Sequence, residues 1–272
     1  MIRTARALSI ASSDSGGGAG IQADVRAFAA AGCHGSTVLV ALTAQNTRQV
    51  SAVHAVPTDF IRAQMDAVFD DIGVDAVKTG MLLSAEIIET VVDGLAGRGL
   101  PLVVDPVMVA SSGARLLNPD AVGVMVRGLF PLATVVTPNL PEAVALTGVT
   151  ASRRELAQRL HDLGAAAVVV TGGHGDTAVD HLFDGTDHVE IPVRRHAIAA
   201  THGAGCTHSA TLAALLAQGW SLLAAAAAAA DVTSAAVAAG LTDIGSGEGP
   251  VDVLDVRSRV RAAPILSAGR ST

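Results

Sequence analysis

Aromatic side chains are scarce in this sequence, so they contribute little to its core. Only 2% of the 272 residues are aromatic, and tyrosine is absent. Half of the residues are nevertheless hydrophobic, which at this length is enough for a sizeable buried core. That core must therefore be built mainly from alanine, valine, leucine and isoleucine.

Positive charge is also limited. Arg and Lys together number 18 against 25 Asp and Glu, which gives a net charge of −7. This balance excludes a general attraction to nucleic acid or to an anionic membrane surface, so any phosphate site must be local. Lys78 is the single lysine of the sequence. It could hold a phosphate group or pair with a nearby carboxylate, and the sequence leaves both readings open.

Cysteines and long apolar runs are few. Cys33 and Cys206 are the two cysteines and have no metal-ligand spacing, which indicates a reduced, cytoplasmic setting. Residues 1–11 contain only a short apolar run and make a poor signal peptide. Residues 221–241 are mostly alanine and include Asp231, so we predict a buried helix there and no membrane span.

Short apolar runs alternate with longer helical patterns, which predicts an α/β fold with a mostly parallel sheet and helices on both faces. No linker divides the sequence, so we expect one domain over residues 1–272. The predicted strands are 7–11, 37–42, 75–78, 102–104, 134–136 and 167–170. The predicted helices are 21–31, 58–71, 84–95, 121–129, 141–147, 152–163, 206–218 and 221–239. Asp184-Gly185 predicts a hairpin between strands 182–184 and 189–193.

A phosphate site is predicted where small residues meet the start of the helix at 206–218. Gly203, Ala204 and Gly205 precede Cys206 there. A helix start leaves backbone N–H groups without partners, and glycines allow a phosphoryl group to approach them closely. The alternative is a glycine-bearing turn that merely enters the helix.

Two other motifs favour a small heterocyclic substrate. Residues 16–20 contain four glycines directly after the first predicted strand, which suits close backbone contact with a ligand. Gln45 offers a donor and an acceptor to an aminopyrimidine-like edge, and Met81 could pack on a flat ring. A mobile loop and a glutamine that only satisfies backbone groups are the alternatives.

Oxygen ligands for magnesium are predicted at two further strand ends. Asp105 closes an apolar strand, and Asn139 and Glu142 stand three residues apart near a helix start. Magnesium keeps several waters, so few protein oxygens are needed. A carboxylate satisfied by backbone N–H groups and a helix cap are the alternatives. Thr171 and Gly173 belong to a loop suited to a nucleotide's phosphates or ribose.

Together these motifs resemble the hydroxymethylpyrimidine/phosphomethylpyrimidine kinases of thiamin biosynthesis, which belong to the ribokinase-like superfamily. The resemblance runs from about Leu8 to Val253. The motifs that carry it are residues 13–24, 44–47, 78–81, 105–109, 137–143, 172–174 and 202–207, joined by 247–251 near the C-terminus.

This resemblance implies a ribokinase-like three-layer sandwich that transfers the γ-phosphoryl group of ATP, with Mg²⁺, to the hydroxymethyl group of 4-amino-5-hydroxymethyl-2-methylpyrimidine. Bifunctional members then phosphorylate the monophosphate. A homodimer is expected, with no nucleic acid or membrane partner, and participation of a monovalent cation is left open.

The resemblance also assigns roles to individual residues. Cys206, at a helix start that should lower its pKa, would accept the substrate hydroxyl proton. The substrate-binding residues would be Ala19, Gln45, Met81 and Val107. The phosphoryl group would be held by Gly203, Ala204 and Gly205, the nucleotide by Asn139, Thr171 and Gly173, and the metal by Asp105 and Glu142.

Three lysines common in the family are replaced here, by Ser111, Thr171 and Ala229. Arg48 or Arg115 could compensate. Because only the second reaction must bind a substrate that already carries phosphate, we expect the first phosphorylation to survive better than the second. A pyridoxal kinase of the same superfamily is one alternative, disfavoured by Gln45. A non-catalytic nucleotide- or vitamin-binding homologue is the other.

Overall fold

The computed structural model describes residues 3–109, 113, 116–118 and 120–262. Its strands form one nine-stranded sheet in the order β3-β2-β1-β4-β5-β6-β7-β8-β9. The six central strands, from β2 to β7 in this order, run parallel to one another. The pairs β3–β2, β7–β8 and β8–β9 at the two ends of the sheet are antiparallel. The predicted α/β class with a mostly parallel sheet is confirmed.

The strands are β1 (Arg6–Asp14), β2 (His34–Gln45), β3 (Val50–Ala55), β4 (Ala76–Thr79), β5 (Leu102–Val104), β6 (Val135–Val136), β7 (Val168–Val170), β8 (Val179–Phe183) and β9 (His188–Pro192). The helices are α1 (Gly20–Ala30), α2 (Thr58–Ala67), α3 (Ala85–Leu95), α4 (Ala121–Gly128), α5 (Leu140–Thr147), α6 (Arg153–Asp162), α7 (Ala204–Ala217), α8 (Leu222–Ala238) and α9 (Val256–Ala262). Two short turns, η1 (Val68–Ile72) and η2 (Phe130–Leu132), follow α2 and α4.

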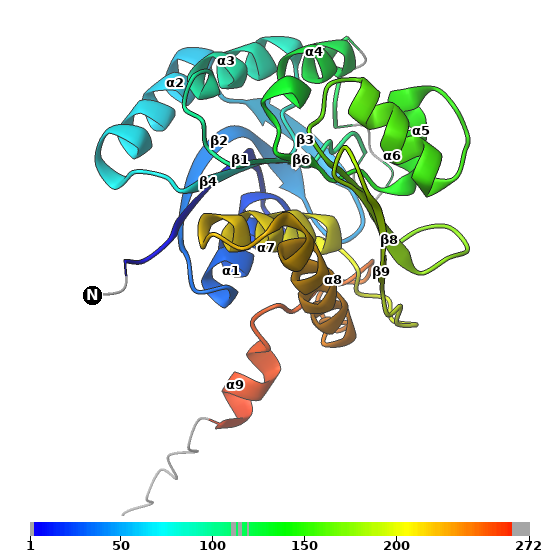
Figure 1. Ribbon diagram of the computed structural model, residues 1–272. Helices are drawn as coiled ribbons and strands as arrows, with labels where there is room; N and C mark the ends of the chain where they lie inside the picture. Colours follow the sequence, from blue (N-terminus) through cyan, green and yellow to red (C-terminus); the bar gives the residue numbers. More distant parts are fainter. Residues whose placement is uncertain (1–2, 110–112, 114–115, 119, 263–272) are drawn as a thin grey trace, which may run out of the picture.

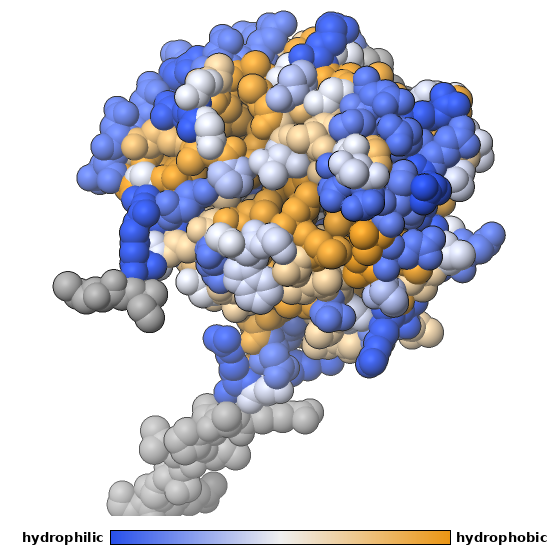
Figure 2. All heavy atoms as spheres, viewed as in Figure 1, coloured by the Kyte–Doolittle hydropathy of each residue, from blue (hydrophilic) through white to orange (hydrophobic). Residues whose placement is uncertain are grey.

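Helices cover both faces of the sheet, as predicted (Figure 1). α2 to α6 pack on one face, where Ile61, Met65 and Phe130 are fully buried in one apolar cluster. α1, α7 and α8 pack on the other, in a cluster that is about half alanine and includes one phenylalanine, Phe28. Small side chains allow α7 and α8 to approach each other and the sheet closely. Figure 2 shows apolar residues in a central band between the two helix layers, with a hydrophilic rim.

The hairpin predicted at Asp184 is present, because β8 and β9 pair on either side of it. The Asp184 Oδ1 atom accepts hydrogen bonds from the N–H groups of Thr186 and Asp187 at 2.9 and 2.7 Å, which closes the turn. The helix predicted at 58–71 ends earlier, since α2 stops at Ala67 and a wider turn follows. Strand β3 was not predicted.

None of the described helices has the length and apolar character that crossing a membrane requires. α8 is the longest of them, and its middle is buried against α7 and the sheet. The helix predicted at 221–239 is therefore confirmed, but only one of its faces is buried, and Asp231 lies on the exposed side.

Candidate active site

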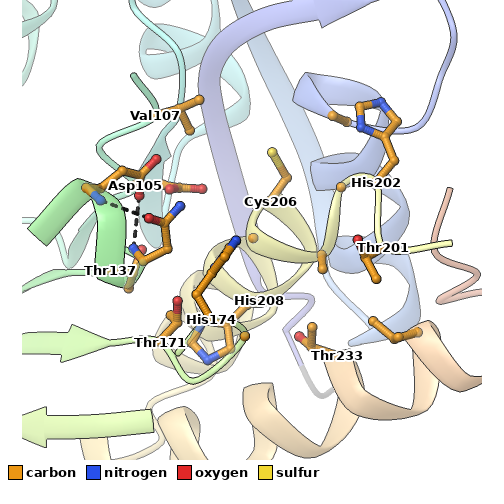
Figure 3. A pocket seen from close by; sticks show the side chains of 18 of the residues that line it. Asp105, Val107, Thr137, Thr171, His174, Thr201, His202, Cys206, His208 and Thr233 are labelled. Carbon is orange, nitrogen blue, oxygen red and sulfur yellow. Dashed lines mark hydrogen bonds between the residues drawn. The ribbon is translucent and has the colours of Figure 1, made fainter. Parts of the chain in front are cut away.

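A cavity of about 630 Å³ opens where the parallel strands end. Its floor is made by the residues that follow β1, β4, β5, β6 and β7, and the first turns of α7 form one wall. This is the edge at which open α/β sheets bind their ligands. Figure 3 shows Asp105 and Val107 on one side, Cys206 in the centre and His202 on the opposite side.

All thirteen residues that the sequence singled out as candidate site residues line this one cavity. They are Ala19, Gln45, Met81, Val107, Asp105, Asn139, Glu142, Thr171, Gly173, Gly203, Ala204, Gly205 and Cys206. Their shared location is a structural result, whereas the role of each remains a prediction.

The start of α7 depends on a glycine. Gly203 is the N-cap and has a φ of 84°, a backbone conformation that side chains other than glycine's disfavour. A Cβ atom there would collide with the carbonyl oxygen of Gly18. The N–H of Ala204 donates to Thr201 O at 3.0 Å. The N–H groups of the first turn have no intrahelical acceptors, and this glycine contact sets them against the glycine-rich loop.

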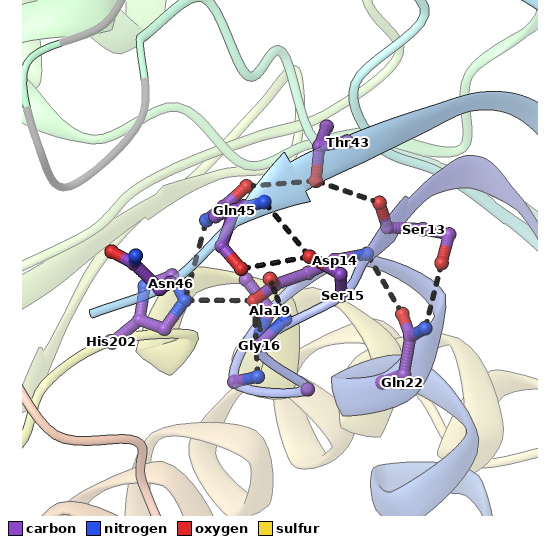
Figure 4. Close-up of polar contacts among 12 residues, drawn as sticks. Ser13, Asp14, Ser15, Gly16, Ala19, Gln22, Thr43, Gln45, Asn46 and His202 are labelled. Atoms are coloured by element: carbon purple, nitrogen blue, oxygen red, sulfur yellow. Dashed lines mark hydrogen bonds and ion pairs between the residues drawn. The ribbon is translucent and has the colours of Figure 1, made fainter. Parts of the chain in front are cut away.

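The glycine-rich loop folds around one carboxylate, that of Asp14 (Figure 4). Asp14 accepts hydrogen bonds from the N–H groups of Gly16, Gly18 and Ala19 at 2.8, 3.0 and 2.9 Å. His202 Nε2 lies 2.9 Å from its Oδ2 atom. Burial raises the pKa of Asp14, but the hydrogen bonds from His202 and the loop outweigh burial and hold that pKa below its usual value. The ionised Asp14 therefore ties the loop to the residue before Gly203.

Gln45 faces the Asp14–His202 contact from the end of β2. Its amide nitrogen lies 3.5 Å from His202 Nε2, and its amide oxygen lies 3.2 Å from Thr43 Oγ1. Thr43 Oγ1 is also 3.0 Å from Ser13 O. The amide is thus oriented by two side chains, those of His202 and Thr43, while it still lines the cavity, as a side chain that reads a ring edge must be.

Lys78 pairs with a carboxylate, which settles the alternative that the sequence left open. Its side chain is fully buried, with Nζ 2.9 and 3.0 Å from the two carboxylate oxygens of Asp24. Ser9 Oγ donates to Asp24 at 2.5 Å, and Asp105 Oδ2 lies 3.9 Å from Nζ. Burial lowers the pKa of Lys78, but the charge of Asp24, the other acidic groups nearby and the hydrogen bond to Asp24 together outweigh burial and keep that pKa above its usual value.

The expected lowered pKa of Cys206 is wrong for the ligand-free protein. Burial raises the pKa of the thiol to about 12, while the positive charge of Lys78 and a backbone hydrogen bond from Gly20 act in the opposite direction. Desolvation of a thiolate therefore outweighs the helix start. Cys206 is a protonated thiol at neutral pH before ligands bind.

Asp105, Asn139 and Glu142 form the acidic side of the cavity. Asn139 and Glu142 cap α5 reciprocally, since each side chain accepts a backbone N–H of the other at 2.9 Å. Ser209 donates to Asp105 Oδ2 at 2.8 Å. Burial and then the charge of Asp105 raise the pKa of Glu142 to about 8. The negative charges of two neighbouring carboxylates repel each other, and a hard divalent cation bound between them would offset this repulsion.

No group of three His, Cys, Asp or Glu side chains in the described part of the chain could hold a metal ion by itself. This agrees with a magnesium ion that keeps most of its waters and is bound by one or two carboxylates together with substrate phosphates. Asp105 and Glu142 fit such an ion, and Asn139 uses its side-chain oxygen to cap α5.

The loop after β7 is fastened on several sides. Arg195 donates to the carbonyl oxygens of Gly172, His174, Gly175 and Thr177 at 2.6–3.0 Å. Five hydrogen bonds from one guanidinium fix the path of this loop. Thr171 and Gly173, two of the three predicted nucleotide-binding residues, therefore occupy defined positions on the cavity wall.

Two of the predictions about the replaced lysines concern residues that the structure describes. Ala229 is wrong as a phosphate-facing position, because it is fully buried in the apolar cluster of α7 and α8, and the neighbouring Ala230 lines the cavity instead. Arg48 is exposed and does not line the cavity. Ser111 and Arg115 lie outside the described residues.

Sequence reasoning missed four residues of this site as functional candidates. Asp14 and His202 stood in the quoted motifs but received no role, and only the fold brings them together. Asp180 and His208 also line the cavity and lie 3.0 Å apart. An aspartate inside an apolar strand pattern was the one available signal for Asp180.

Comparison with known proteins agrees with this geometry. A sequence model described as phosphomethylpyrimidine kinase matches residues 14–252. The hydroxymethylpyrimidine/phosphomethylpyrimidine kinase of Rhizobium meliloti is 51% identical over 256 residues, which cover 91% of this chain and 96% of that protein.

Two solved structures are similar over most of the chain. The pyridoxal kinase of Bacillus subtilis, in an ADP complex, has a TM-score of 0.85 and 38% identity, covering 94% of this chain and 99% of that one. The phosphomethylpyrimidine kinase of Clostridium difficile has a TM-score of 0.76 and 38% identity, covering 85% and 98%.

Proposed function

Because the chain belongs to the phosphomethylpyrimidine kinase family, we propose that it phosphorylates the hydroxymethyl group of 4-amino-5-hydroxymethyl-2-methylpyrimidine with ATP, in thiamin biosynthesis. The observation that supports this most is the contact between the glycine-rich loop and the start of α7. Gly18 and Gly203 are packed backbone to backbone. A ring bound beside Ala19 and Gln45 would thus present its substituent to the first turn of α7.

The substrate ring is expected to lie among Ala19, Gln45, Met81 and Val107. Gln45 supplies one donor and one acceptor to the amino-pyrimidine edge. Met81 is buried at the cavity floor, where its thioether can pack on the ring. Ala19 and Val107 are small enough to leave the hydroxymethyl group facing α7.

The substrate hydroxyl would pass its proton to the thiolate form of Cys206 as its oxygen bonds to the γ-phosphorus, while the bond from that phosphorus to the β,γ-bridging oxygen breaks and ADP leaves. Gly203 and Gly205 would present backbone N–H groups to the transferring phosphoryl group, which stabilises charge that develops there. The N–H of Ala204, also assigned to this group, would first have to leave Thr201 O. Lys78 lowers the cost of a Cys206 thiolate, against the burial that opposes it. Positioning and charge stabilisation supply most of the acceleration in reactions of this class.

ATP is proposed to extend from α7 toward Thr171, Gly173 and the cavity wall made by α8. Thr137 and Thr233 line this part of the cavity, and their buried hydroxyls have no hydrogen-bond partner among the described residues. Buried polar atoms of this kind indicate a polar ligand. Asp105 and Glu142 would hold Mg²⁺, which neutralises phosphate charge when bound.

The test is product analysis by mass spectrometry after incubation with ATP, Mg²⁺ and a panel of hydroxymethylated heterocycles. We expect a phosphorylated product from the aminopyrimidine that forms faster than any other. Binding of the pyrimidine and ATP without phosphorylated product would favour the non-catalytic alternative. A Gln45→Ala variant should lose the preference among heterocycles while keeping the background ATP hydrolysis of the wild type.

The second phosphorylation, of the monophosphate, is proposed to be slower than the first. No lysine other than Lys78 exists in the sequence, and Lys78 is committed to Asp24. Each absent charge–phosphate contact costs on the order of 1.5–3 kcal/mol in a shielded site. Steady-state rates with the alcohol and with its monophosphate measure the difference, and equal efficiencies would refute this proposal.

Pyridoxal is the second candidate substrate, because the pyridoxal kinase of Bacillus subtilis has a higher TM-score to this chain than the phosphomethylpyrimidine kinase of Clostridium difficile. Competition between pyridoxal and the aminopyrimidine in one preparation separates the two. We expect the aminopyrimidine to win, since Gln45 suits its edge.

We further propose that the chain acts as a single kinase domain, in the cytoplasm and as a homodimer. Light scattering on the purified protein measures the oligomeric state. Rates in potassium and in sodium chloride at equal ionic strength would show whether a monovalent cation takes part.

A further inference from the structure

Asp180 and His208 connect two walls of the cavity that are distant in sequence. Asp180 belongs to β8, next to the loop after β7, and His208 lies one turn beyond Ala204 on α7. Both side chains are buried, at 3% and 4% exposure, and both line the cavity. The chemistry proposed above uses neither of them.

The Asp180 carboxylate is shared between these walls. Its Oδ1 atom accepts the Gly172 N–H at 2.5 Å, and its Oδ2 atom lies 3.0 Å from His208 Nε2. A carboxylate only accepts, so the imidazole donates through Nε2 and its Nδ1 is the unprotonated nitrogen when the ring is neutral. The Gly172 peptide is therefore linked to α7 through two hydrogen bonds and one carboxylate.

The imidazole carries a cost that packing alone does not explain. His208 Nδ1 is buried and has no hydrogen-bond partner among the described residues. A buried polar atom without a partner destabilises the folded state. An apolar side chain would fill the same space and leave no polar atom unpaired. What the histidine adds is the bond to Asp180.

We infer that the Asp180–His208 pair is a positioning pair for the nucleotide, which sets the loop at Thr171–Gly173 against the phosphate-binding start of α7. Arg195 fixes the carbonyl side of the same loop, whereas Asp180 fixes an N–H. This inference rests on the proposed function only in taking the ligand between these walls to be ATP. The pair acts through the loop and need not touch the reacting atoms.

The test uses three substitutions at one position and the full-length protein. His208→Gln can keep a donor near the place of Nε2, whereas His208→Asn is too short to reach Asp180 and His208→Leu has no donor. We expect the two non-donating variants to bind the ATP analogue AMP-PCP about five- to tenfold more weakly. The Gln variant should bind within about twofold of wild type, and pyrimidine affinity should stay unchanged in all three.

The chemical shift of the Gly172 amide proton reports directly on the hydrogen bond between Gly172 and Asp180. The Gly172 amide proton, in a short charge-assisted bond, should change its chemical shift in the Leu and Asn variants and change it less in the Gln variant. His161→Gln is the matched control, since His161 lies on α6 and does not line the cavity. It should leave AMP-PCP binding and the Gly172 signal as in wild type.

Three results would overturn the inference. They are wild-type AMP-PCP affinity in His208→Leu, equal weakening by Gln and Leu, and parallel loss of AMP-PCP and pyrimidine binding. If both ligands bind more weakly in parallel, a lower free energy of unfolding in urea would show that His208 supports the fold and not the nucleotide site. AMP-PCP binding requires no acceptor, so an incorrect pyrimidine assignment would appear in the product analysis and leave this measurement unaffected.

Discussion

Cys206 and Lys78 line the same cavity, and burial raises the pKa of the thiol to about 12 even though the charge of the lysine opposes that rise. A thiol with that pKa is almost entirely protonated at neutral pH, but its thiolate is a strong base. The thiolate fraction of such a group grows about tenfold for each unit by which the pH rises, up to the pKa. The proton-accepting role of Cys206 therefore has a pH signature.

Replacing Cys206 by alanine should lower kcat by more than about tenfold, because general base catalysis usually contributes more than that. Single-turnover rates of the wild type should rise as the pH is raised above neutrality, and those of Cys206→Ala should rise less. Cys33→Ala is the control, since Cys33 is buried against α7 away from the cavity. A loss of less than tenfold in Cys206→Ala would make Cys206 a packing residue only.

The Lys78–Asp24 pair gives a prediction about stability. Lys78→Met leaves the buried carboxylate of Asp24 without a positive partner and should lower the free energy of unfolding by about 3–5 kcal/mol. The double variant Asp24→Asn/Lys78→Met should lower it by less. The raised pKa of Lys78 places the loss of this contribution above the usual pH range. Burial raises the pKa of Asp24, and Lys78→Met removes the charge that opposes this, so the folded single variant holds a proton that its unfolded chain releases. The difference between the variants, measured by urea unfolding, should therefore grow as the pH rises from about 6 to about 9, because the double variant has no carboxyl at this position. A double variant no more stable than Lys78→Met would contradict this.

At the scale of elements, residues that form continuous apolar runs or capped helices were predictable, and exposed segments were not. Ser84 and Ser152 cap α3 and α6 through hydrogen bonds to the third helical residue, as their sequence context indicated. β3 has no buried residue and pairs only with β2. Such an edge strand carries no hydrophobic pattern, so periodicity could not find it.

The start of α7 supplies a prediction about one turn. Gly203 and Gly219 both have a φ of 84°, but a Cβ on Gly203 would collide with Gly18 and one on Gly219 would meet nothing within 4 Å. Gly219→Ala should therefore lower the free energy of unfolding by about 1–2 kcal/mol, because alanine disfavours a positive φ, and should keep its activity. Gly203→Ala should also lose about a hundredfold or more in kcat, because the phosphate-binding N–H groups shift. Equal kinetics in the two variants would exclude this role for the turn.

At the scale of the molecule, the sheet explains both what the sequence could predict and what it could not. Parallel strands end at one edge, so motifs that follow strands were expected to meet, and all thirteen candidates do. The pairs Asp14–His202 and Asp180–His208 join segments separated by 188 and 28 residues. Nothing local in the chain encodes such pairs, because they depend on how α7 packs on the sheet.

Glu142 makes the stability of the whole protein depend on pH. Its pKa is about 8 in the folded state against an ordinary value of 4.5, so between these values the folded protein holds a proton that the unfolded chain releases. The free energy of unfolding must therefore fall as the pH rises through this window. Glu142→Gln keeps the capping geometry and removes the titration, so its stability should decline less from about pH 5 to about pH 8.

Glu155 offers a matched control for this last measurement. It is also the third residue of a capped helix, where Ser152 caps α6, but its side chain is exposed and paired with Arg159. Urea unfolding at several pH values should give parallel curves for Glu155→Gln and the wild type and a flatter curve for Glu142→Gln. Because Mg²⁺ would displace the same proton, Mg²⁺ with AMP-PCP should stabilise the wild type more at pH 8 than at pH 6. Parallel curves for all three proteins would show that Glu142 is not held protonated beside Asp105.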